Sequence, residues 1–278
     1  MEEYWAVPYV PGRWRVKSPL RYPGGKFYAL KHIMPYIECA AHDEYREPFL
    51  GGGSVFFAKK KAQYNILNDF EPELINFYRV ILDDEMRQEL IRRFDSEVAS
   101  RERHSQVKQM QPVTPLERAF RTYYLNRTSY CGIINAPAWG HAVGKSSPPE
   151  NWGRFLEDAA EKLRGAELSA LDYAEILRLP ARGRRVLTYL DPPYYHADQK
   201  RAYTKPFTPE EHLRLANDLQ QYEHLFCLSY DDCEEIRTLY AWARIYDVSW
   251  LYNTANSSGG KRKACRELII TNYDVRHT

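Results

Sequence analysis

Short apolar runs rich in β-branched or aromatic residues alternate along this chain with segments that carry helix start signals. Each run has the length and composition of a buried strand. The stronger predicted strands are residues 64–67, 186–190, 225–229, 245–250 and 267–271, and weaker ones are predicted at 44–49 and 167–171. Strands and helices in alternation indicate an α/β fold, with a mostly parallel sheet and helices on both of its faces.

Two predicted helices begin with Thr-Pro-x-Glu, at Thr114 and Thr208, a pattern typical of a capped helix start. Between residues 76 and 164 the strand–helix alternation stops. That segment holds predicted helices at 75–82, 84–98 and 115–126, followed by a Gly-, Pro- and Ser-rich stretch at 132–149. We therefore predict one α/β domain made of residues 1–75 and 165–278, with an inserted, mainly helical lobe at 76–164.

The charge of the chain is concentrated in the predicted lobe. The whole sequence has 39 basic and 37 acidic residues, a net charge of +2, which excludes a polybasic binder of the tail type. Residues 101–148 nevertheless carry an excess of five positive charges, interleaved with aromatic residues such as Tyr123, Tyr124, Tyr130 and Trp139. This pattern fits either a nucleic-acid surface or a solvated helix face.

Neither a membrane nor a metal is expected. The sequence has no stretch of about 18 apolar residues and no secretory signal at its start, so we expect a cytoplasmic location. The five cysteines form no C-x-x-C or Cys/His pair with zinc spacing, which argues against a structural metal. None of the eight histidines falls in a motif, and His196 is assigned to a loop.

A glycine-rich turn, Gly51-Gly52-Gly53, lies between a predicted strand and a predicted helix at 54–61. Backbone amides at such a turn can approach a nucleotide-like ligand closely. Asp69 follows the next strand, 18 residues after Gly51, where a carboxylate can accept both hydroxyls of a ribose. A helix-capping Asp is the alternative. Residues 24–26 and 144–146 look like P-loop fragments, but both lack required positions, so an NTPase is rejected.

The most informative peptide is Asp191-Pro192-Pro193-Tyr194, directly after the strand at 186–190. Parallel strands bind ligands at their carboxyl ends. Two prolines stiffen the turn and remove two amide donors, so it presents the Asp191 carboxylate and the Pro192 carbonyl as acceptors beside the Tyr194 ring. This set complements a planar ring with an amino group. A simple Pro-Pro turn would not explain the acid and the tyrosines.

The motifs together resemble those of the DNA adenine N6-methyltransferases of the Dam type (D12 class, alpha group), over nearly the whole chain after residue 18. The matching segments are 19–26, 47–53, 191–194, Tyr124-Leu125-Asn126-Arg127 with Gly132, Leu171-Asp172-Tyr173, and 257–260 followed by Glu267-Leu268. The resemblance implies a Rossmann-like sheet that binds S-adenosylmethionine (SAM), with the lobe at 76–164 recognising target DNA.

The same resemblance implies a role for individual residues. The residues implied in catalysis are Asp191, Pro192 and Tyr194. The residues implied in SAM binding are Tyr22, Lys26, Pro48, Phe49, Gly51, Gly53, Ser54, Asp69, Asp172, Tyr173 and Asp191. The residues implied in DNA binding are Arg21, Arg118, Arg121, Asn126, Arg127, Tyr130, Asn135, Lys145, Lys261 and Arg262.

We therefore expect methyl transfer from SAM to N6 of an adenine flipped out of duplex DNA. Cys131 and Asn135 stand where GATC-specific relatives carry Asn and a guanine-reading Arg, so GATC is not predicted as the target. The competing hypotheses are an RNA adenine methyltransferase and an inactive SAM- or DNA-binding module. Expected partners are duplex DNA and, in a restriction–modification system, a cognate restriction endonuclease.

Overall fold

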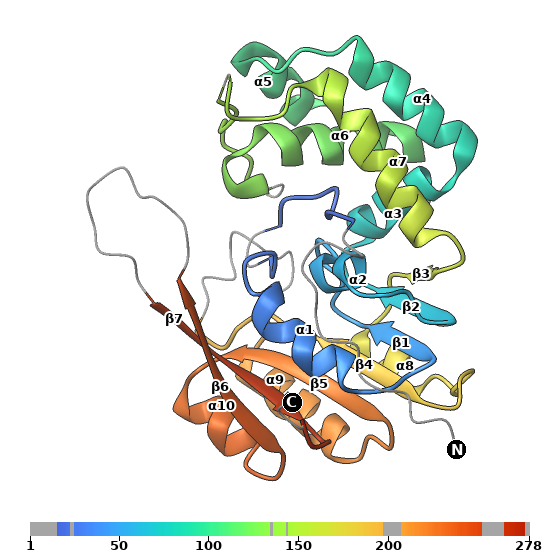
Figure 1. The fold of residues 1–278 in the computed structure, drawn as a ribbon. Coiled ribbons are helices and arrows are strands. Elements are labelled where there is room, and N and C mark those ends of the chain that lie inside the picture. The colour runs from blue at the N-terminus through green and yellow to red at the C-terminus, as the bar shows by residue number, and fades with distance from the viewer. Residues whose placement is uncertain are drawn as a thin grey trace.

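The structure, a computed structural model, describes residues 16–22, 25–133, 136–142, 144–196, 207–251 and 264–275. A seven-stranded sheet occupies one part of the molecule and a group of helices stands above it (Figure 1). The strands are β1 (Glu44–Glu47), β2 (Tyr64–Asn68), β3 (Glu167–Ser169), β4 (Val186–Leu190), β5 (Leu225–Asp231), β6 (Arg244–Leu251) and β7 (Ala264–Thr271). The sequence-predicted strands, including the two weaker ones, are confirmed, with β1 and β3 shorter than expected.

The order of strands is β3-β2-β1-β4-β5-β7-β6. β1 pairs in parallel with β2 and β4, β2 with β3, and β4 with β5. β7 enters between β5 and β6 and runs antiparallel to both, so the last two strands form a hairpin at one edge. The prediction of a mostly parallel α/β sheet is thus confirmed, with an antiparallel edge added. The carboxyl ends of β1, β2 and β4 lie at one side of the sheet.

Helices cover both faces of this sheet. They are α1 (Leu30–Glu38) and α2 (Ser54–Ala58) on one face, and α8 (Tyr173–Arg178), α9 (Pro209–Gln220) and α10 (Glu234–Leu239) on the other. Each face has its own hydrophobic core. Along β4, Leu187 and Tyr189 belong to the core on the side of α1 and α2, and Leu190 belongs to the core on the other side. Along β5, Cys227 belongs to the former core and Leu228 to the latter. This alternation is why the buried strands are apolar throughout.

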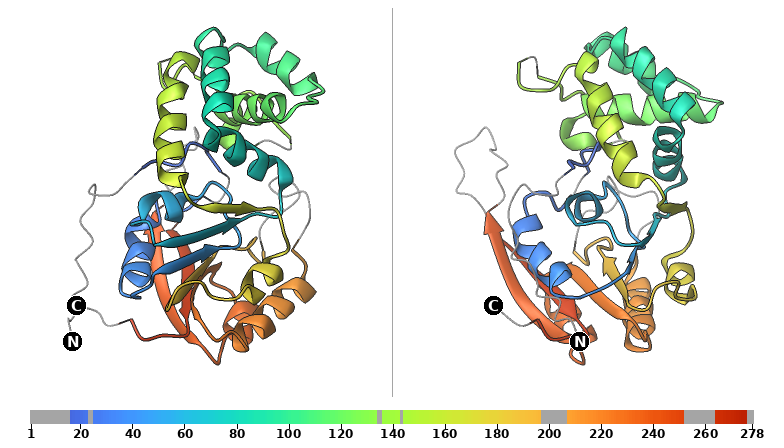
Figure 2. Two further views of the ribbon diagram at one scale, coloured as in Figure 1. Left: turned by 90° about the vertical axis from the view of Figure 1, so that its right-hand side faces the viewer. Right: turned by 45° about the vertical axis from the view of Figure 1, so that its right-hand side comes forward.

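The remaining helices form the group above the sheet in both further views (Figure 2). They are α3 (Pro72–Leu82), α4 (Asp84–Asp95), α5 (Arg101–Gln109), α6 (Pro115–Thr128) and α7 (Trp152–Leu163), with the short helices η1 (Tyr130–Gly132) and η2 (Pro149–Asn151). The helix predicted at 84–98 ends three residues early, and Ser100 caps α5 instead. Thr114 and Glu117 form the expected capping box. Among described residues, no helix is long and apolar enough to cross a membrane.

One hydrophobic core runs from the sheet into the helical group. It includes α1, α2 and β1 residues together with aromatic side chains of α3, α4, α6 and α7. Phe77 stacks on Tyr123 with ring centroids 5.2 Å apart, and Trp152 packs edge-on against Phe94 and Tyr123. Such contacts fix the helices relative to the sheet, because buried aromatic pairs combine large area with specific geometry.

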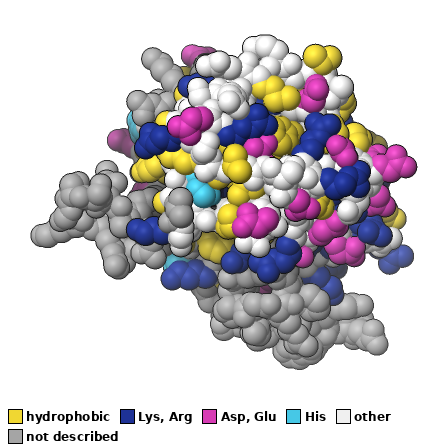
Figure 3. Space-filling model, turned by 90° about the horizontal axis from the view of Figure 1, so that it is seen from above, with side chains coloured by type: hydrophobic (Ala, Val, Ile, Leu, Met, Phe, Trp, Pro, Cys, Tyr) yellow, Lys and Arg dark blue, Asp and Glu magenta, His cyan; other side chains and the backbone are white. Residues whose placement is uncertain are grey.

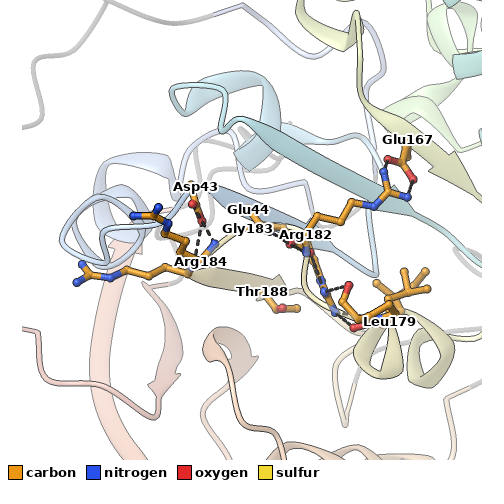
Figure 4. Close-up of polar contacts among 12 residues, drawn as sticks. Asp43, Glu44, Glu167, Leu179, Arg182, Gly183, Arg184 and Thr188 are labelled. Atoms are coloured by element: carbon orange, nitrogen blue, oxygen red, sulfur yellow. Dashed lines mark hydrogen bonds and ion pairs between the residues drawn. The ribbon is translucent and has the colours of Figure 1, made fainter.

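Carboxylates at the amino ends of β1 and β4 serve the fold. Asp43 accepts the backbone N–H groups of Arg184 and Arg185, and Glu44 accepts those of Arg182 and Gly183 at 2.6 and 2.8 Å (Figure 4). Glu44 is also paired with Arg46 at 2.7 Å, and both side chains are fully buried. The acceptors here bind protein donors, which leaves the opposite, carboxyl side of the sheet as the place for chemistry.

Candidate active site

Asp191 directly follows β4 and lies beside a lysine from the N-terminal motif. The Nζ atom of Lys26 is 2.7 Å from Oδ1 of Asp191, and the Ser229 hydroxyl of β5 donates to the same oxygen at 2.9 Å. The Lys26 side chain is almost fully buried, whereas the Asp191 side chain is 21% exposed. Since both of these contacts engage Oδ1, the Oδ2 atom can accept a further N–H group from a substrate.

Tyr194, the last residue of the Asp-Pro-Pro-Tyr turn, is fixed at both ends of its side chain. Its hydroxyl donates to Oε2 of Glu267 at 2.5 Å, and Nζ of Lys26 lies 4.6 Å from its ring centroid. Burial raises the pKa of Tyr194 well above its usual value, with the Glu267 and Asp191 carboxylates adding to the shift. The hydroxyl therefore stays protonated and keeps the ring in one orientation.

The backbone after Tyr194 is tied to the end of β5. The two carboxylate oxygens of Asp231 accept the N–H groups of Tyr195 and His196 at 3.1 and 3.3 Å. A carboxylate that accepts two successive amides holds a turn in place. The rim carrying Asp191 and Tyr194 is thus anchored by β5 as well as stiffened by its prolines.

The glycine turn lies at the same side of the sheet. Gly51 and Gly53 adopt φ of 49° and 66°, which glycine tolerates best. A Cβ on Gly51 would also stand 3.1 Å from the Tyr22 ring, so Tyr22 packs directly on the turn. Ser54 begins α2 immediately after it.

Asp69 supports this turn from the end of β2. Its carboxylate accepts the N–H groups of Gly51 at 2.7 Å and Glu71 at 3.0 Å. Burial raises the pKa of Asp69 to about 6, although these two N–H donors oppose the shift. Each carboxylate oxygen has two lone pairs, so Asp69 retains capacity for a hydroxyl donor.

An aromatic cluster adjoins the end of β1. Phe49 stacks on Tyr173 at 5.4 Å between centroids, and Phe207 meets Phe49 edge-on at 5.8 Å. Asp172 caps α8 and pairs with Arg214 at 2.8 Å, which places the Arg214 guanidinium 5.0 Å from the Tyr173 ring. The structure therefore brings the predicted residues Phe49, Asp172 and Tyr173 together.

Asn68 joins the ends of two strands at this site. Its Nδ2 atom donates to the carbonyls of Pro48 and Leu171, each at 3.0 Å, so it fixes the segments after β1 and β3 relative to each other. This buried amide thereby ties Pro48 to the residue that precedes Asp172.

Comparison with known proteins identifies this arrangement. Residues 22–254 match the family described as D12 class N6 adenine-specific DNA methyltransferase. The chain belongs to this family. It is 27% identical over 277 residues to the type II methyltransferase M1.LlaDCHI of Lactococcus lactis subsp. cremoris, covering 91% of this chain and 94% of that protein.

Two further relatives agree. The DNA adenine methylase of Escherichia coli strain K12 is 29% identical over 268 residues, covering 90% of this chain and 93% of that protein. The type II methyltransferase M.CviBI of Paramecium bursaria Chlorella virus NC1A is 25% identical over 272 residues, covering 93% and 100%. The chain is an adenine-specific DNA methyltransferase.

Two residues expected to bind DNA have a different environment in the methyltransferase. Asn126 is fully buried; its amide accepts the N–H of Arg21 at 2.9 Å and donates to the carbonyls of Arg21 at 2.6 Å and Gly132 at 3.0 Å. The Arg21 guanidinium donates to the carbonyls of Asn126, Arg127 and Ser129. Both side chains join the N-terminal motif to α6, so we propose that they act as a structural brace rather than as DNA contacts.

Three other predicted DNA-binding residues of the methyltransferase, Arg118, Arg121 and Arg127, lie on α6. Arg118 pairs with Glu73 at 2.6 Å, Arg121 donates to the carbonyl of Lys108, and the Arg127 guanidinium lies 5.1 Å from the Phe155 ring. Tyr130 and Lys145 are exposed. Asn135, Lys261 and Arg262 lie outside the described residues.

Charges on the far side of the lobe are mixed. Seen from above, Lys and Arg side chains lie beside Asp and Glu side chains (Figure 3). Such a face presents no single-sign field to a phosphate backbone.

Sequence reasoning missed several residues of the site: Asn68, Arg214, Ser229, Asp231 and Glu47. Glu47 ends β1; it is buried and accepts the Tyr45 hydroxyl at 2.7 Å. Burial raises its pKa to about 8, and the Asp191 carboxylate adds to the shift. Asp231, two residues after the predicted strand at 225–229, and Asn68, next to the predicted Asp69, were usable signals, whereas nothing local marked Arg214.

Proposed function

We propose that this methyltransferase transfers a methyl group from SAM to N6 of an adenine that has been extruded from duplex DNA into the site beside Asp191. The observation that carries the proposal is the pairing of one partly exposed carboxylate, Asp191, with one fixed aromatic ring, Tyr194, at the carboxyl end of β4. An amino group on a planar ring is complementary to both.

The residues at the ends of β1 and β2 fit SAM. The glycine turn has two positive-φ positions, Gly51 against the Tyr22 ring and Gly53, and Asp69 supplies a carboxylate next to Gly51. Phe49, which is only partly buried, offers an apolar face for an adenine ring, with Tyr173 stacked behind it. When bound, SAM supplies an electrophilic methyl carbon. Tyr22, Phe49, Gly51, Gly53, Asp69 and Tyr173 would hold it there.

Asp191 acts on the amino group of the target base. The amino lone pair is delocalised into the purine ring, and an acceptor that holds one N–H out of the ring plane localises that pair on nitrogen. Oδ2 of Asp191 is available for this contact while Lys26 and Ser229 hold Oδ1. The carboxylate also stabilises the positive charge that develops on nitrogen, as preorganised groups do in general.

The energy of base extrusion can be met within the site. Extrusion costs a few kcal/mol. Stacking on an aromatic ring returns roughly 1 to 3 kcal/mol, and a hydrogen bond to a charged acceptor about 1.5 to 3 kcal/mol. Tyr194 and Asp191 supply one of each, so no covalent bond to the enzyme is required.

The lobe at 76–164 is the proposed target-recognition region. Its exposed Tyr130 and Lys145 support this assignment, together with the local excess of positive charge. Because Cys131 and Asn135 depart from the GATC-type pattern, we propose a recognition sequence other than GATC.

Labelled SAM tests the proposal directly. Wild-type protein should label duplex DNA at N6 of adenine, whereas Asp191→Ala should abolish turnover with SAM affinity within about tenfold of wild type. Asp95→Asn, an exposed carboxylate change at the end of α4, is the matched control and should leave turnover intact. Labelling of RNA in preference to DNA, SAM and DNA binding without transfer, or near wild-type turnover by Asp191→Ala would each contradict the proposal.

A further inference from the structure

Three potential metal ligands meet just beyond the Asp-Pro-Pro-Tyr turn. They are Nε2 of His196, Sγ of Cys233 and a carboxylate oxygen of Glu235, all within 4.8 Å of one another. Cys233 is the N-cap residue of α10 and Glu235 lies in its first turn, while His196 comes from the segment after β4. The three residues are 37 and 2 positions apart, so no sequence motif joins them.

We propose that His196, Cys233 and Glu235 form a binding site for a thiophilic divalent cation of the Zn²⁺ type. Imidazole, thiolate and carboxylate are the ligands that Zn²⁺ takes in proteins. Three protein ligands leave a fourth tetrahedral position for water. This proposal reverses the expectation of no metal, which rested only on the local spacing of cysteines and histidines.

The spacing of the ligand atoms suits a tetrahedral ion. With Zn–N and Zn–O bonds of about 2.0 to 2.1 Å, two tetrahedral ligands stand about 3.3 Å apart. The His196 Nε2 and Glu235 Oε2 atoms are separated by 3.3 Å. The Cys233 thiol lies within 4.8 Å of both of these atoms, close enough to be the third ligand.

The surrounding structure holds these ligands in place and leaves them accessible. Asp231 accepts the backbone N–H of His196, and the Tyr195 ring packs edge-on against the imidazole at 5.1 Å. The His196 and Glu235 side chains are 59% and 43% exposed, so an ion can reach them from solvent. A bound ion would connect the turn after Tyr194 to α10, two segments joined at present by the contact between His196 and Glu235.

Metal titration of the full chain tests the site. Protein freed of metal is titrated with Zn²⁺ against a chromogenic chelator, and we expect one ion per chain. His196→Ala, Cys233→Ser and Glu235→Gln should each weaken binding by more than about tenfold, because even the outer partners of metal ligands are worth about 10- to 100-fold in affinity. Glu234→Gln and Cys131→Ser, a neighbouring acid and an exposed cysteine elsewhere, are the matched controls and should change affinity less than twofold.

Cobalt provides a readout that separates a thiolate ligand from a nearby thiol. Wild-type protein loaded with Co²⁺ should show sulfur-to-cobalt charge-transfer absorption, which Cys233→Ser should lose. Excess Zn²⁺ should raise the melting temperature of wild-type protein and leave that of Cys233→Ser unchanged. Equal affinity in all variants, or a cobalt spectrum unaffected by Cys233→Ser, would show that His196 and Glu235 form only a hydrogen bond and would overturn the proposal. Neither readout depends on methyl transfer.

Discussion

The Tyr194 hydroxyl donates to the Glu267 carboxylate at 2.5 Å, across 73 positions of sequence. Glu267 belongs to β7, the strand inserted antiparallel beside β5, and it is buried. The orientation of the aromatic ring in the active site is therefore set by the edge hairpin of the sheet. Since the ring is proposed to stack on the target adenine, Glu267 of the hairpin would act as a positioning residue.

Replacing Glu267 by Leu should lower the rate of methyl transfer by about tenfold or more, because the Tyr194 hydroxyl loses its hydrogen bond to a charged carboxylate, which is worth about 1.5 to 3 kcal/mol. Glu267→Gln keeps an acceptor and should retain more activity. Single-turnover rates of both variants check this, with the affinity for SAM expected to stay within twofold. In a double-mutant cycle with Tyr194→Phe the losses should not add; full additivity would contradict the coupling.

Asn126→Ala should lower the free energy of unfolding by about 1 to 3 kcal/mol, because the backbone N–H and carbonyl of Arg21 and the carbonyl of Gly132 lose buried partners. The salt dependence of DNA binding should not change. Urea unfolding and a salt titration measure the two effects. Asn76→Ala, which removes one exposed hydrogen bond, is the control and should cost little. A stable Asn126→Ala protein with a reduced salt slope would restore the DNA-contact role.

Glu47→Gln should become more stable relative to wild type as the pH rises from 5 to 7. Burial raises the pKa of Glu47 from 4.5 to about 8, so in this window the folded chain keeps a proton that the unfolded chain releases. The contribution of Glu47 to wild-type stability therefore falls with rising pH by up to about 1.4 kcal/mol per pH unit, a loss that the amide escapes.

Urea unfolding at pH 5, 6 and 7 measures this difference. Burial lowers the pKa of Lys59 to about 7, so Lys59 begins to contribute only at the upper end of the range. The exposed change Glu161→Gln should follow the wild-type pH dependence. Parallel curves for Glu47→Gln and wild type would refute the raised pKa.

Lys145→Ala should reduce the slope of log K for DNA against log salt by about 0.9, the value for one lost phosphate contact. Affinity should fall by a similar factor for all DNA sequences, because phosphate contacts carry no base information directly. Lys60→Ala removes an equal charge from an exposed position after α2 and should leave the slope unchanged. Fluorescence anisotropy at several salt concentrations distinguishes the two variants. An unaltered slope for Lys145→Ala would show that Lys145 does not contact the phosphate backbone.

Strand positions could be predicted because burial on both faces makes a strand apolar along its length, as in 186–190 and 225–229. The capped start of α6 at Thr114 was equally local. The strand order could not be predicted from local sequence, because the antiparallel insertion of β7 depends on contacts between segments far apart in sequence. Local reasoning likewise could not reveal that the polar groups of Asn126 meet those of Arg21.

By itself, the sequence determined which groups we propose for the chemistry: an acid and a tyrosine on a proline-stiffened turn after a buried strand, and a glycine turn after another. These features follow from backbone constraints over a few residues. Only the tertiary structure decided what holds them, namely Lys26 on Asp191, Glu267 on Tyr194 and Asp231 on the turn. A side chain's partners depend on which strands lie side by side, and that is settled by packing of the whole sheet.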